Sequence, residues 1–443
     1  MATNERLSKA NKPAEDAMKL HPFYRGKMQT LPRCTVRNMD DFAIWYTPGV
    51  AAPCKAIKEN KDLVYDYTCK WNTVAVVSDG TRVLGLGDIG PEAAMPVMEG
   101  KALLFKYLGG VDAVPICLDT KDPDEFIQTV KYLQPSFGGI NLEDISSPKC
   151  FYILDRLRNE MEIPVWHDDQ QGTAAVTLAA LINALKLVGK KMDEVKMAMI
   201  GAGAANVCIA KVLIKAGVTA GNIYMTDVDG ILNPGRTELK DSKELWELCT
   251  TTNAEGRTGG NAEAIKGTDV VIALSAPGPG IINKEWISTM ADEAIVFACA
   301  NPVPEIWPWE AKEAGARIVV TGRSDFPNQV NNSLGFPAIF RGALDVRAKT
   351  ITDEMCIAAA YALANFAEEK GLLRDDYLLP TMEDWEAFPR EAAAVGVKAV
   401  EQGVARIERS YEDLYDTAVK TILEAQEMTQ LLMREGYIAK VPK

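Results

Sequence analysis

The chain has 443 residues, 47% hydrophobic and 25% charged, which is typical of a globular protein with a sizeable core and about two or three domains. Its 48 Lys and Arg against 61 Asp and Glu give a net charge of −13, which disfavours nucleic acid or an anionic membrane as a partner. There is no long uninterrupted apolar run and the N-terminus is polar, so we expect a cytoplasmic protein without a membrane span or an export signal. The nine cysteines form no Cys-x-x-Cys pair, so we expect neither a disulfide framework nor a zinc site.

The first part of the chain, residues 1–172, mixes turns with short strand-like runs at 73–77 and 111–118 and a helical pattern at 151–158. Two acidic pairs, Glu143-Asp144 and Asp168-Asp169, follow apolar or turn segments. Several converging carboxylates do not all stay ionised without a cation, and hard oxygen ligands favour Mg²⁺ or Mn²⁺. His167 stands beside Trp166, and we interpret it as a structural histidine.

The middle part alternates strands with helices, the pattern of a parallel sheet wound with helices. A hinge is expected near Gly172, where a loop gives way to a helix. The predicted strands lie at residues 196–200, 223–227, 269–275, 294–300 and 317–321, and the predicted helices at 173–188 and 205–216. From residue 352 the chain reads as helical, with a break at 380–389.

These patterns predict an α/β fold with a Rossmann-type, doubly wound parallel sheet. The domains predicted are an N-terminal α/β substrate and metal domain at 1–172, a dinucleotide-binding domain at 173–345 and C-terminal helices at 346–443.

A candidate nucleotide loop lies between the strands predicted at 196–200 and 223–227. Gly201 permits a tight turn, Gly203 lets a pyrophosphate approach the backbone, and the following helix supplies N–H donors. Asn206 occupies the position of the third glycine, so the motif is incomplete. Asp227 ends the next strand, where a carboxylate recognises a ribose.

Two later loops follow predicted strands at the edge where parallel sheets bind ligands. One is Ser275-Ala-Pro-Gly-Pro-Gly280 and the other is Asn301-Pro-Val-Pro304. For the Ser275 loop, ligand binding and ordinary turn chemistry both remain open.

Together these residues resemble the malic enzyme family, in its short two-domain form, over almost the whole chain. The motifs that carry the resemblance are Tyr46-Thr-Pro-Gly-Val50, Asp79-Gly-Thr-Arg-Val-Leu-Gly-Leu-Gly-Asp-Ile-Gly90, Glu99-Gly-Lys101, Asn141-Leu-Glu-Asp144, His167-Asp-Asp-Gln-Gln-Gly-Thr173, Gly201-Ala-Gly203, Asn301-Pro302 and Asn331-Asn-Ser-Leu-Gly-Phe-Pro337. The resemblance implies metal-dependent oxidative decarboxylation of malate to pyruvate and CO₂, with reduction of NAD or NADP.

The resemblance also implies roles for single residues. Lys101 is expected to be the general base, with its pKa lowered from about 10.4 toward about 7.5, supported by Asp168, and Tyr46 the general acid. The implied metal ligands are Glu143, Asp144 and Asp169; the implied substrate contacts are Arg82, Asn301 and Asn332; the implied cofactor contacts are Gly201, Gly203, Ala204, Ala205, Asn206, Asp227 and Asn301.

The preferred cofactor is expected to be NAD, because the Asp227 carboxylate would repel a 2′-phosphate. The expected partners are malate and further copies of the chain, as a homodimer or larger oligomer. Two alternatives stay open. One is a malolactic enzyme, which yields lactate without net NADH, and the other is a catalytically silent dinucleotide-binding protein.

Overall fold

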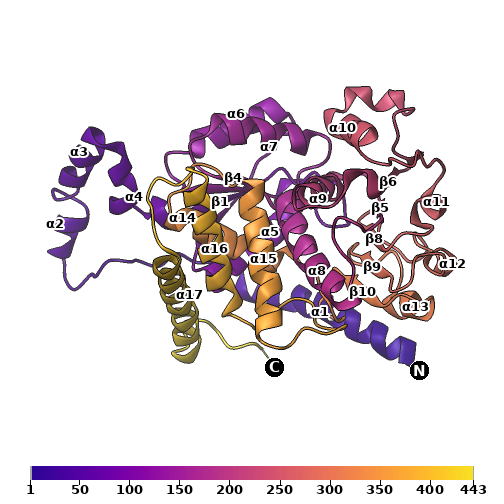
Figure 1. The fold of residues 1–443 in the computed structure, drawn as a ribbon. Helices are drawn as coiled ribbons and strands as arrows, with labels where there is room; N and C mark the ends of the chain where they lie inside the picture. Colours follow the sequence, from indigo (N-terminus) through magenta and orange to yellow (C-terminus); the bar gives the residue numbers. More distant parts are fainter. Residues whose placement is uncertain (1, 443) are drawn as a thin grey trace.

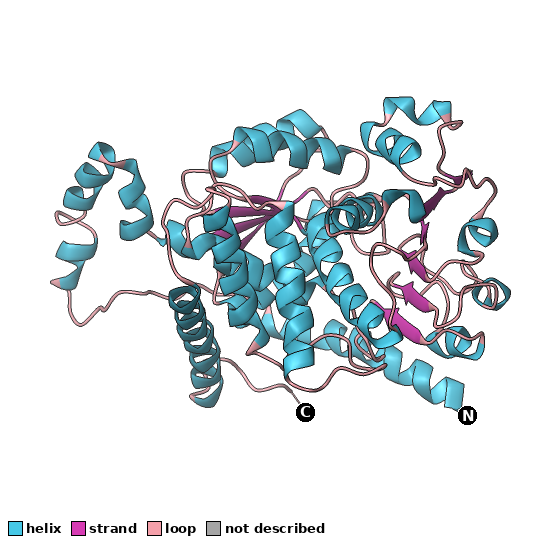
Figure 2. Ribbon diagram, viewed as in Figure 1, coloured by secondary structure: helices cyan, strands magenta, loops and turns pink. Residues whose placement is uncertain are grey.

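A computed structural model describes residues 2–442, with side chains from residue 12 onward, and contains two separate sheets (Figures 1 and 2). The first sheet is entirely parallel, in the order β2-β1-β3-β4. Its strands are β1 (Thr73–Ser78), β2 (Asp112–Cys117), β3 (Gly139–Leu142) and β4 (Val165–His167). The helices of this region are α5 (Pro91–Gly109), α6 (Pro123–Leu133) and α7 (Lys149–Glu160). The Asp122 carboxylate caps α6 by accepting the backbone N–H groups of its first turn.

The second sheet has the order β10-β9-β8-β5-β6-β7, and only the short strand β7 is antiparallel to its neighbour. Its strands are β5 (Met197–Ile200), β6 (Ile223–Asp227), β7 (Gly230–Ile231), β8 (Val270–Ala273), β9 (Ile295–Ala298) and β10 (Ile318–Thr321). The helices between them are α9 (Ala204–Lys215), α10 (Lys243–Thr251), α11 (Asn261–Ile265), α12 (Lys284–Ile287) and α13 (Pro308–Glu313). The strands are buried apolar runs, as expected of a parallel sheet covered on both faces.

A buried helix, α8 (Thr173–Val188), joins the two sheets. It continues from a π-helical turn, Asp168–Gly172, where the sequence predicts a loop. The segment Asp168–Val188 is long and apolar enough to cross a membrane by length and composition. Its 18-residue window is 78% buried inside the protein, as in the core helix of a globular fold.

Four further helices cover the first sheet and α8. They are α14 (Phe336–Asp345), α15 (Asp353–Glu369), α16 (Ala387–Glu401) and α17 (Tyr411–Arg434). Helix α17 packs on α5, and α15 packs on α8. The predicted C-terminal helices and their break are therefore confirmed, as are all seven predicted strands to within two residues at each end. Strands β3, β4 and β7 were not predicted from the sequence.

A segment near the N-terminus stands apart from the rest of the fold (Figure 1). This arm, residues 38–68, follows α1 (Ala2–Tyr24) and carries α2 (Asp41–Trp45), α3 (Ala51–Glu59) and α4 (Val64–Tyr67). It is held at its C-terminal end, where Asp66 pairs with Arg347. Just beyond the arm, the Asn72 side chain donates to the Gly110 carbonyl at 2.9 Å. Helix α3 buries none of its residues.

Candidate active site

The predicted metal ligands lie together at the carboxyl ends of β3 and β4. Glu143 and Asp144 follow β3, and Asp169 lies in the π-helical turn after β4. One ligand atom from each residue lies within 4.8 Å of the others. Among the described residues, the buried Oδ2 of Asp144 has no hydrogen-bond partner. Three oxygen donors with an unpartnered buried oxygen fit a hard divalent cation.

The Lys101 ammonium lies beside this cluster and is almost fully buried on α5. Its Nζ lies 3.0 Å from Glu143 Oε1 and donates a short hydrogen bond to Asp168 Oδ2. Asp168 is fully buried and also accepts the Trp166 indole N–H at 3.2 Å. Gly172 makes room for it, since a Cβ there would lie 2.0 Å from Asp168 Oδ1. Two carboxylates and an indole therefore hold the lysine at one position.

The electrostatics of these groups oppose the low lysine pKa that the sequence led us to expect. Burial alone would lower the pKa of Lys101, but the Asp168 and Glu143 carboxylates outweigh it and the pKa is raised. Burial and the neighbouring Asp169 raise the pKa of Asp144 to about 8. The protein groups alone thus carry an excess of negative charge, which a bound cation would neutralise.

The nucleotide loop between β5 and α9 has the geometry its glycines predict. Gly201 adopts φ +98°, and a Cβ there would lie 3.0 Å from both the Leu274 carbonyl and Ser275 Cβ. A Cβ on Gly203 would meet no atom within 4 Å, so the backbone is open toward the cavity. The Asn206 side chain points away from the cavity. Its buried amide donates to the carbonyls of Ile200 and Gly201 at 2.9 and 2.8 Å, so it braces the loop and does not line the cavity.

Asp227 lines the cavity at the end of β6, but it is already paired. Arg236 folds back across the turn and donates to both of its carboxylate oxygens, at 3.0 and 2.8 Å. Arg236 lies nine positions after Asp227 in the chain, beyond the turn at Asn233-Pro-Gly235. The loop at residues 258–261 was missed altogether, although Asn261 accepts the Thr226 hydroxyl at 2.8 Å and lines the same cavity.

One large cavity brings most of the predicted residues together. It opens between the two sheets, and its walls come from both. The predicted residues that line it are Arg82, Lys101, Glu143, Asp144, Asp169, Gly201, Gly203, Ala204, Ala205, Asp227, Asn301 and Asn332. The carboxylate cluster and the nucleotide loop therefore face one space. Asp168 lies behind Lys101 rather than in the wall, and His167 is fully buried with its Nδ1 3.7 Å from Asp169.

Tyr46 is also absent from the cavity wall, and it lies on the arm. It ends α2 on the arm, is 73% exposed and does not line the cavity. Two further tyrosines of the arm, Tyr65 and Tyr67 on α4, are also outside the cavity lining. Within one chain, the described residues of the cavity wall thus include no tyrosine.

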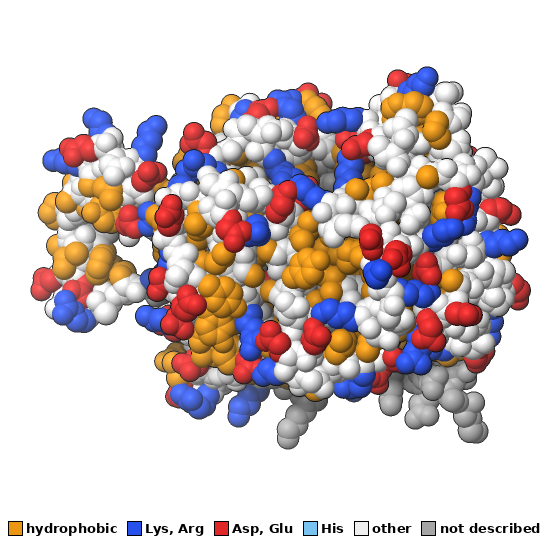
Figure 3. All heavy atoms as spheres, viewed as in Figure 1, with side chains coloured by type: hydrophobic (Ala, Val, Ile, Leu, Met, Phe, Trp, Pro, Cys, Tyr) orange, Lys and Arg blue, Asp and Glu red, His pale blue; other side chains and the backbone are white. Residues whose placement is uncertain are grey.

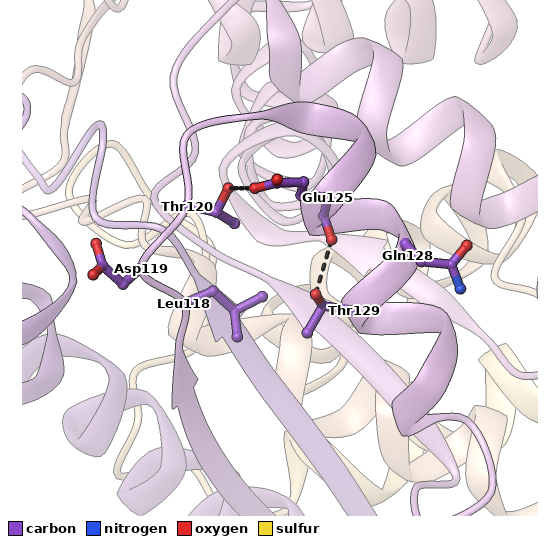
Figure 4. A pocket seen from close by; sticks show the side chains of 6 residues that line it. All are labelled: Leu118, Asp119, Thr120, Glu125, Gln128 and Thr129. Carbon is purple, nitrogen blue, oxygen red and sulfur yellow. Dashed lines mark hydrogen bonds between the residues drawn. The ribbon is translucent and has the colours of Figure 1, made fainter.

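A second, smaller pocket lies at the start of α6 (Figure 4). There the Thr120 hydroxyl donates to the Glu125 carboxylate at 2.7 Å, and the Thr129 hydroxyl donates to the Glu125 carbonyl at 2.8 Å. These polar groups satisfy one another, and no predicted site residue lies in this pocket.

Comparison with known proteins accounts for this arrangement. Residues 25–158 match the family described as "Malic enzyme, N-terminal domain" and residues 170–401 match "Malic enzyme, NAD binding domain". A bifunctional malic/malolactic enzyme of Bacillus subtilis is 51% identical over 92% of this chain and 98% of its own length. An NAD-dependent malic enzyme of Geobacillus stearothermophilus is 51% identical over 86% of this chain and 78% of its own length.

Solved structures of malic enzymes have the same fold as this chain. The malic enzyme of Entamoeba histolytica superposes with a TM-score of 0.97 at 50% identity, covering 100% of this chain and 93% of its own. That of Pyrococcus horikoshii superposes with a TM-score of 0.89 at 51% identity, covering 93% and 95%.

Proposed function

This chain belongs to the malic enzyme family, and we propose how the residues of its cavity carry out the family's reaction. The reaction is the oxidative decarboxylation of malate to pyruvate and CO₂, with reduction of NAD(P)⁺. The observation that supports the proposed roles is that the nucleotide loop and the carboxylate cluster line the same cavity. The test is an assay with malate, Mn²⁺ and each cofactor, following both reduced cofactor and pyruvate.

Glu143, Asp144 and Asp169 hold a divalent cation, Mg²⁺ or Mn²⁺, and Arg82 binds a malate carboxylate beside them. The Arg82 backbone N–H donates to the Asp144 carbonyl at 3.0 Å, so the arginine loop is tied to the metal ligands. When bound, the cation supplies a Lewis acid that stabilises negative charge on the substrate oxygen, and the nicotinamide supplies the hydride acceptor.

A cation at the neighbouring carboxylates would offset the negative charge that raises the pKa of Lys101, and would so allow a neutral amine at this position. Lys101 then takes the proton of the C2 hydroxyl as hydride leaves C2, and Asp168 keeps its Nζ oriented toward the substrate. Asn301 and Asn332 line the same cavity and contact the substrate as neutral hydrogen-bonding groups. After CO₂ leaves, the remaining enol needs a proton at C3, and a tyrosine hydroxyl is the donor that the family motif assigns to Tyr46.

We infer that Tyr46 reaches the cavity from the arm of a second copy in a homodimer. On the arm, Phe42, Ile44, Trp45 and Val50 are between 39% and 56% exposed, a concentration of apolar side chains that is costly to leave in water. Figure 3 shows apolar side chains gathered on the arm. Burying this surface against a second copy would place Tyr46 beside a site that lacks a tyrosine of its own.

Co-expression of two inactive variants tests whether Tyr46 acts in the cavity of the second copy. Tyr46→Phe and Lys101→Met chains, co-expressed, should regain up to about one quarter of wild-type activity, because a mixed dimer has one intact site and half of the dimers are mixed. The matched control co-expresses Asp168→Asn with Lys101→Met, whose lesions share one site, and should regain nothing. Absence of recovery in the first mixture, with dimers present, would place Tyr46 in its own chain's site.

NAD is the proposed cofactor, because Asp227 stands where a ribose is recognised and carries a formal negative charge. The relatives include the NAD-dependent enzyme of Geobacillus stearothermophilus and also an NADP-dependent malic enzyme of Halomonas elongata, which is 44% identical over 85% of this chain and 90% of its own length. The pairing of Asp227 with Arg236 lessens the repulsion of a 2′-phosphate, so we propose a preference rather than an exclusion.

A second candidate activity is malolactic conversion, which a relative's name, "Bifunctional malic/malolactic enzyme", brings into consideration. The same cavity would then return the hydride to pyruvate before release. Lactate formed without accumulation of NADH would favour this activity, and pyruvate formed in step with NADH would favour the first. A cofactor-binding protein that turns over neither product would be the silent alternative.

A further inference from the structure

A buried glutamate joins the two loops that sequence reasoning singled out after β8 and β9. Glu305 is fully buried. Its Oε1 accepts the Ser275 backbone N–H at 3.0 Å, and its Oε2 accepts the Ala300 backbone N–H at 3.0 Å. Its own carbonyl accepts the N–H groups of Gly280 and Ile282 at 3.1 and 3.2 Å. One residue therefore fixes both ends of the Ser275 loop and the start of the Asn301 loop.

Both loops line the cavity, and each touches a different part of the site. Ser275 lies against the nucleotide loop, since its Cβ is 3.0 Å from where a Cβ on Gly201 would be. On the other side, a Cβ on Gly85 would lie 2.6 Å from the Asn301 carbonyl and 3.2 Å from Pro277. Gly85 belongs to the loop of Arg82, which the first sheet supplies. The two loops thus form a bridge from the dinucleotide side to the malate side.

We propose that Glu305 is a positioning residue that sets the distance between the bound dinucleotide and malate, by holding these two loops together. The proposal rests on the proposed function, because it assigns the two sides of the cavity to those ligands. Under this proposal the Ser275 loop is part of the ligand-binding wall and not merely an ordinary turn, and Glu305 holds it in place. Each carboxylate oxygen of Glu305 accepts a backbone N–H group, and these hydrogen bonds offset part of the cost of burying its charged form.

The test compares Glu305→Gln with the wild-type protein, both loaded with Mn²⁺. Glutamine keeps the shape and one acceptor oxygen, but its NH₂ group faces an N–H donor, so one loop is released. We expect the Kd of NAD, measured by tryptophan fluorescence, to rise by about tenfold and kcat with malate to fall by at least as much. The Kd of Mn²⁺ should stay within about twofold, because the carboxylate cluster lies on the other sheet.

The matched control is Glu310→Gln, five residues on, whose carboxylate accepts the Trp307 N–H at the start of α13 outside the cavity. It should leave both dissociation constants and kcat unchanged. Wild-type affinity for NAD in folded Glu305→Gln protein would overturn the proposal, as would equal losses in NAD and Mn²⁺ binding. Because NAD binding is measured without malate, either result is distinct from a wild-type protein that fails to oxidise malate.

A measurement on the unmodified protein covers the case in which Glu305→Gln does not fold. The amide hydrogens of Ser275 and Ala300 should exchange slowly with solvent deuterium before any cofactor is added, because the carboxylate already holds them. Rapid exchange that slows only when NAD binds would mean that the cofactor, and not Glu305, orders the two loops.

Discussion

The sharpest test of the site is the removal of the Lys101 ammonium. Methionine at this position keeps the unbranched chain and its packing over the Phe336 ring, which Nζ approaches to 4.2 Å from the ring centre. The substitution removes the ammonium group that lies 3.0 Å from Glu143 Oε1 and that also pairs with the Asp168 carboxylate. A cation at the neighbouring carboxylates would offset part of the negative charge left behind.

The expected loss comes from proton transfer. A positioned general base contributes about 10²–10⁴-fold, so kcat for malate should fall by that factor in Lys101→Met. Breaking a buried ion pair costs about 3–5 kcal/mol, so the unfolding midpoint should fall as well. The Kd of NAD should remain near the wild-type value, because Gly201 and Gly203 belong to the other sheet.

Stopped-flow or steady-state formation of NADH gives kcat, and fluorescence titration gives the Kd of NAD. Lys106→Met is the control, since Lys106 lies on the same helix and pairs with Asp112 at 2.7 Å outside the cavity. If Lys101→Met keeps more than about a tenth of the wild-type kcat, another group accepts the hydroxyl proton and the assignment fails.

Other predictions are as follows. Asp169→Asn and Glu143→Gln should each raise the Mn²⁺ concentration for half-maximal activity by about tenfold or more, and two unchanged titrations would remove the metal assignment. The kcat/KM for NAD should be about tenfold higher than that for NADP, and Asp227→Ser should lower this ratio. A wild-type preference for NADP would refute the role given to Asp227. Burial raises the pKa of the unpartnered Glu391 well above its usual range, so its ionisation costs stability as pH rises above its unfolded value. Glu391→Gln should therefore raise the unfolding temperature more at about pH 8 than at about pH 5, and an equal shift at both would contradict this. Asn206→Ala should lower the free energy of unfolding in urea by about 1–3 kcal/mol, and no change would mean that its two hydrogen bonds contribute nothing.

Local patterns were enough to predict the five parallel strands of the second sheet and a cluster of acidic residues, from which the family resemblance selected three metal-ligand candidates. Each of these five strands is a short apolar run followed by a turn, and the two acidic pairs follow apolar or turn segments. Gly201 was also predictable from a local pattern. Its turn has φ +98°, which favours glycine, and the strand and helix that flank it in the sequence mark the turn.

Long-range contacts were not predictable. Nothing in the sequence near Asp227 states that Arg236 will fold back onto it, and nothing near Glu305 states that its carboxylate will join two loops. The raised pKa of Lys101 depends on two carboxylates that lie 42 and 67 positions away in the chain. The placement of Tyr46 on a protruding arm depends on packing that one sequence does not reveal.

Gly172 shows how strictly the site constrains the chain. Its backbone is ordinary helix, with φ −65° and ψ −48°, so any residue could adopt it, and alanine there would normally stabilise a helix by about 1 kcal/mol. A single added methyl group would nevertheless occupy the place of the Asp168 carboxylate. A stabilising-looking substitution would therefore displace the group that orients the lysine. Engineering this helix for heat resistance has to leave that position untouched.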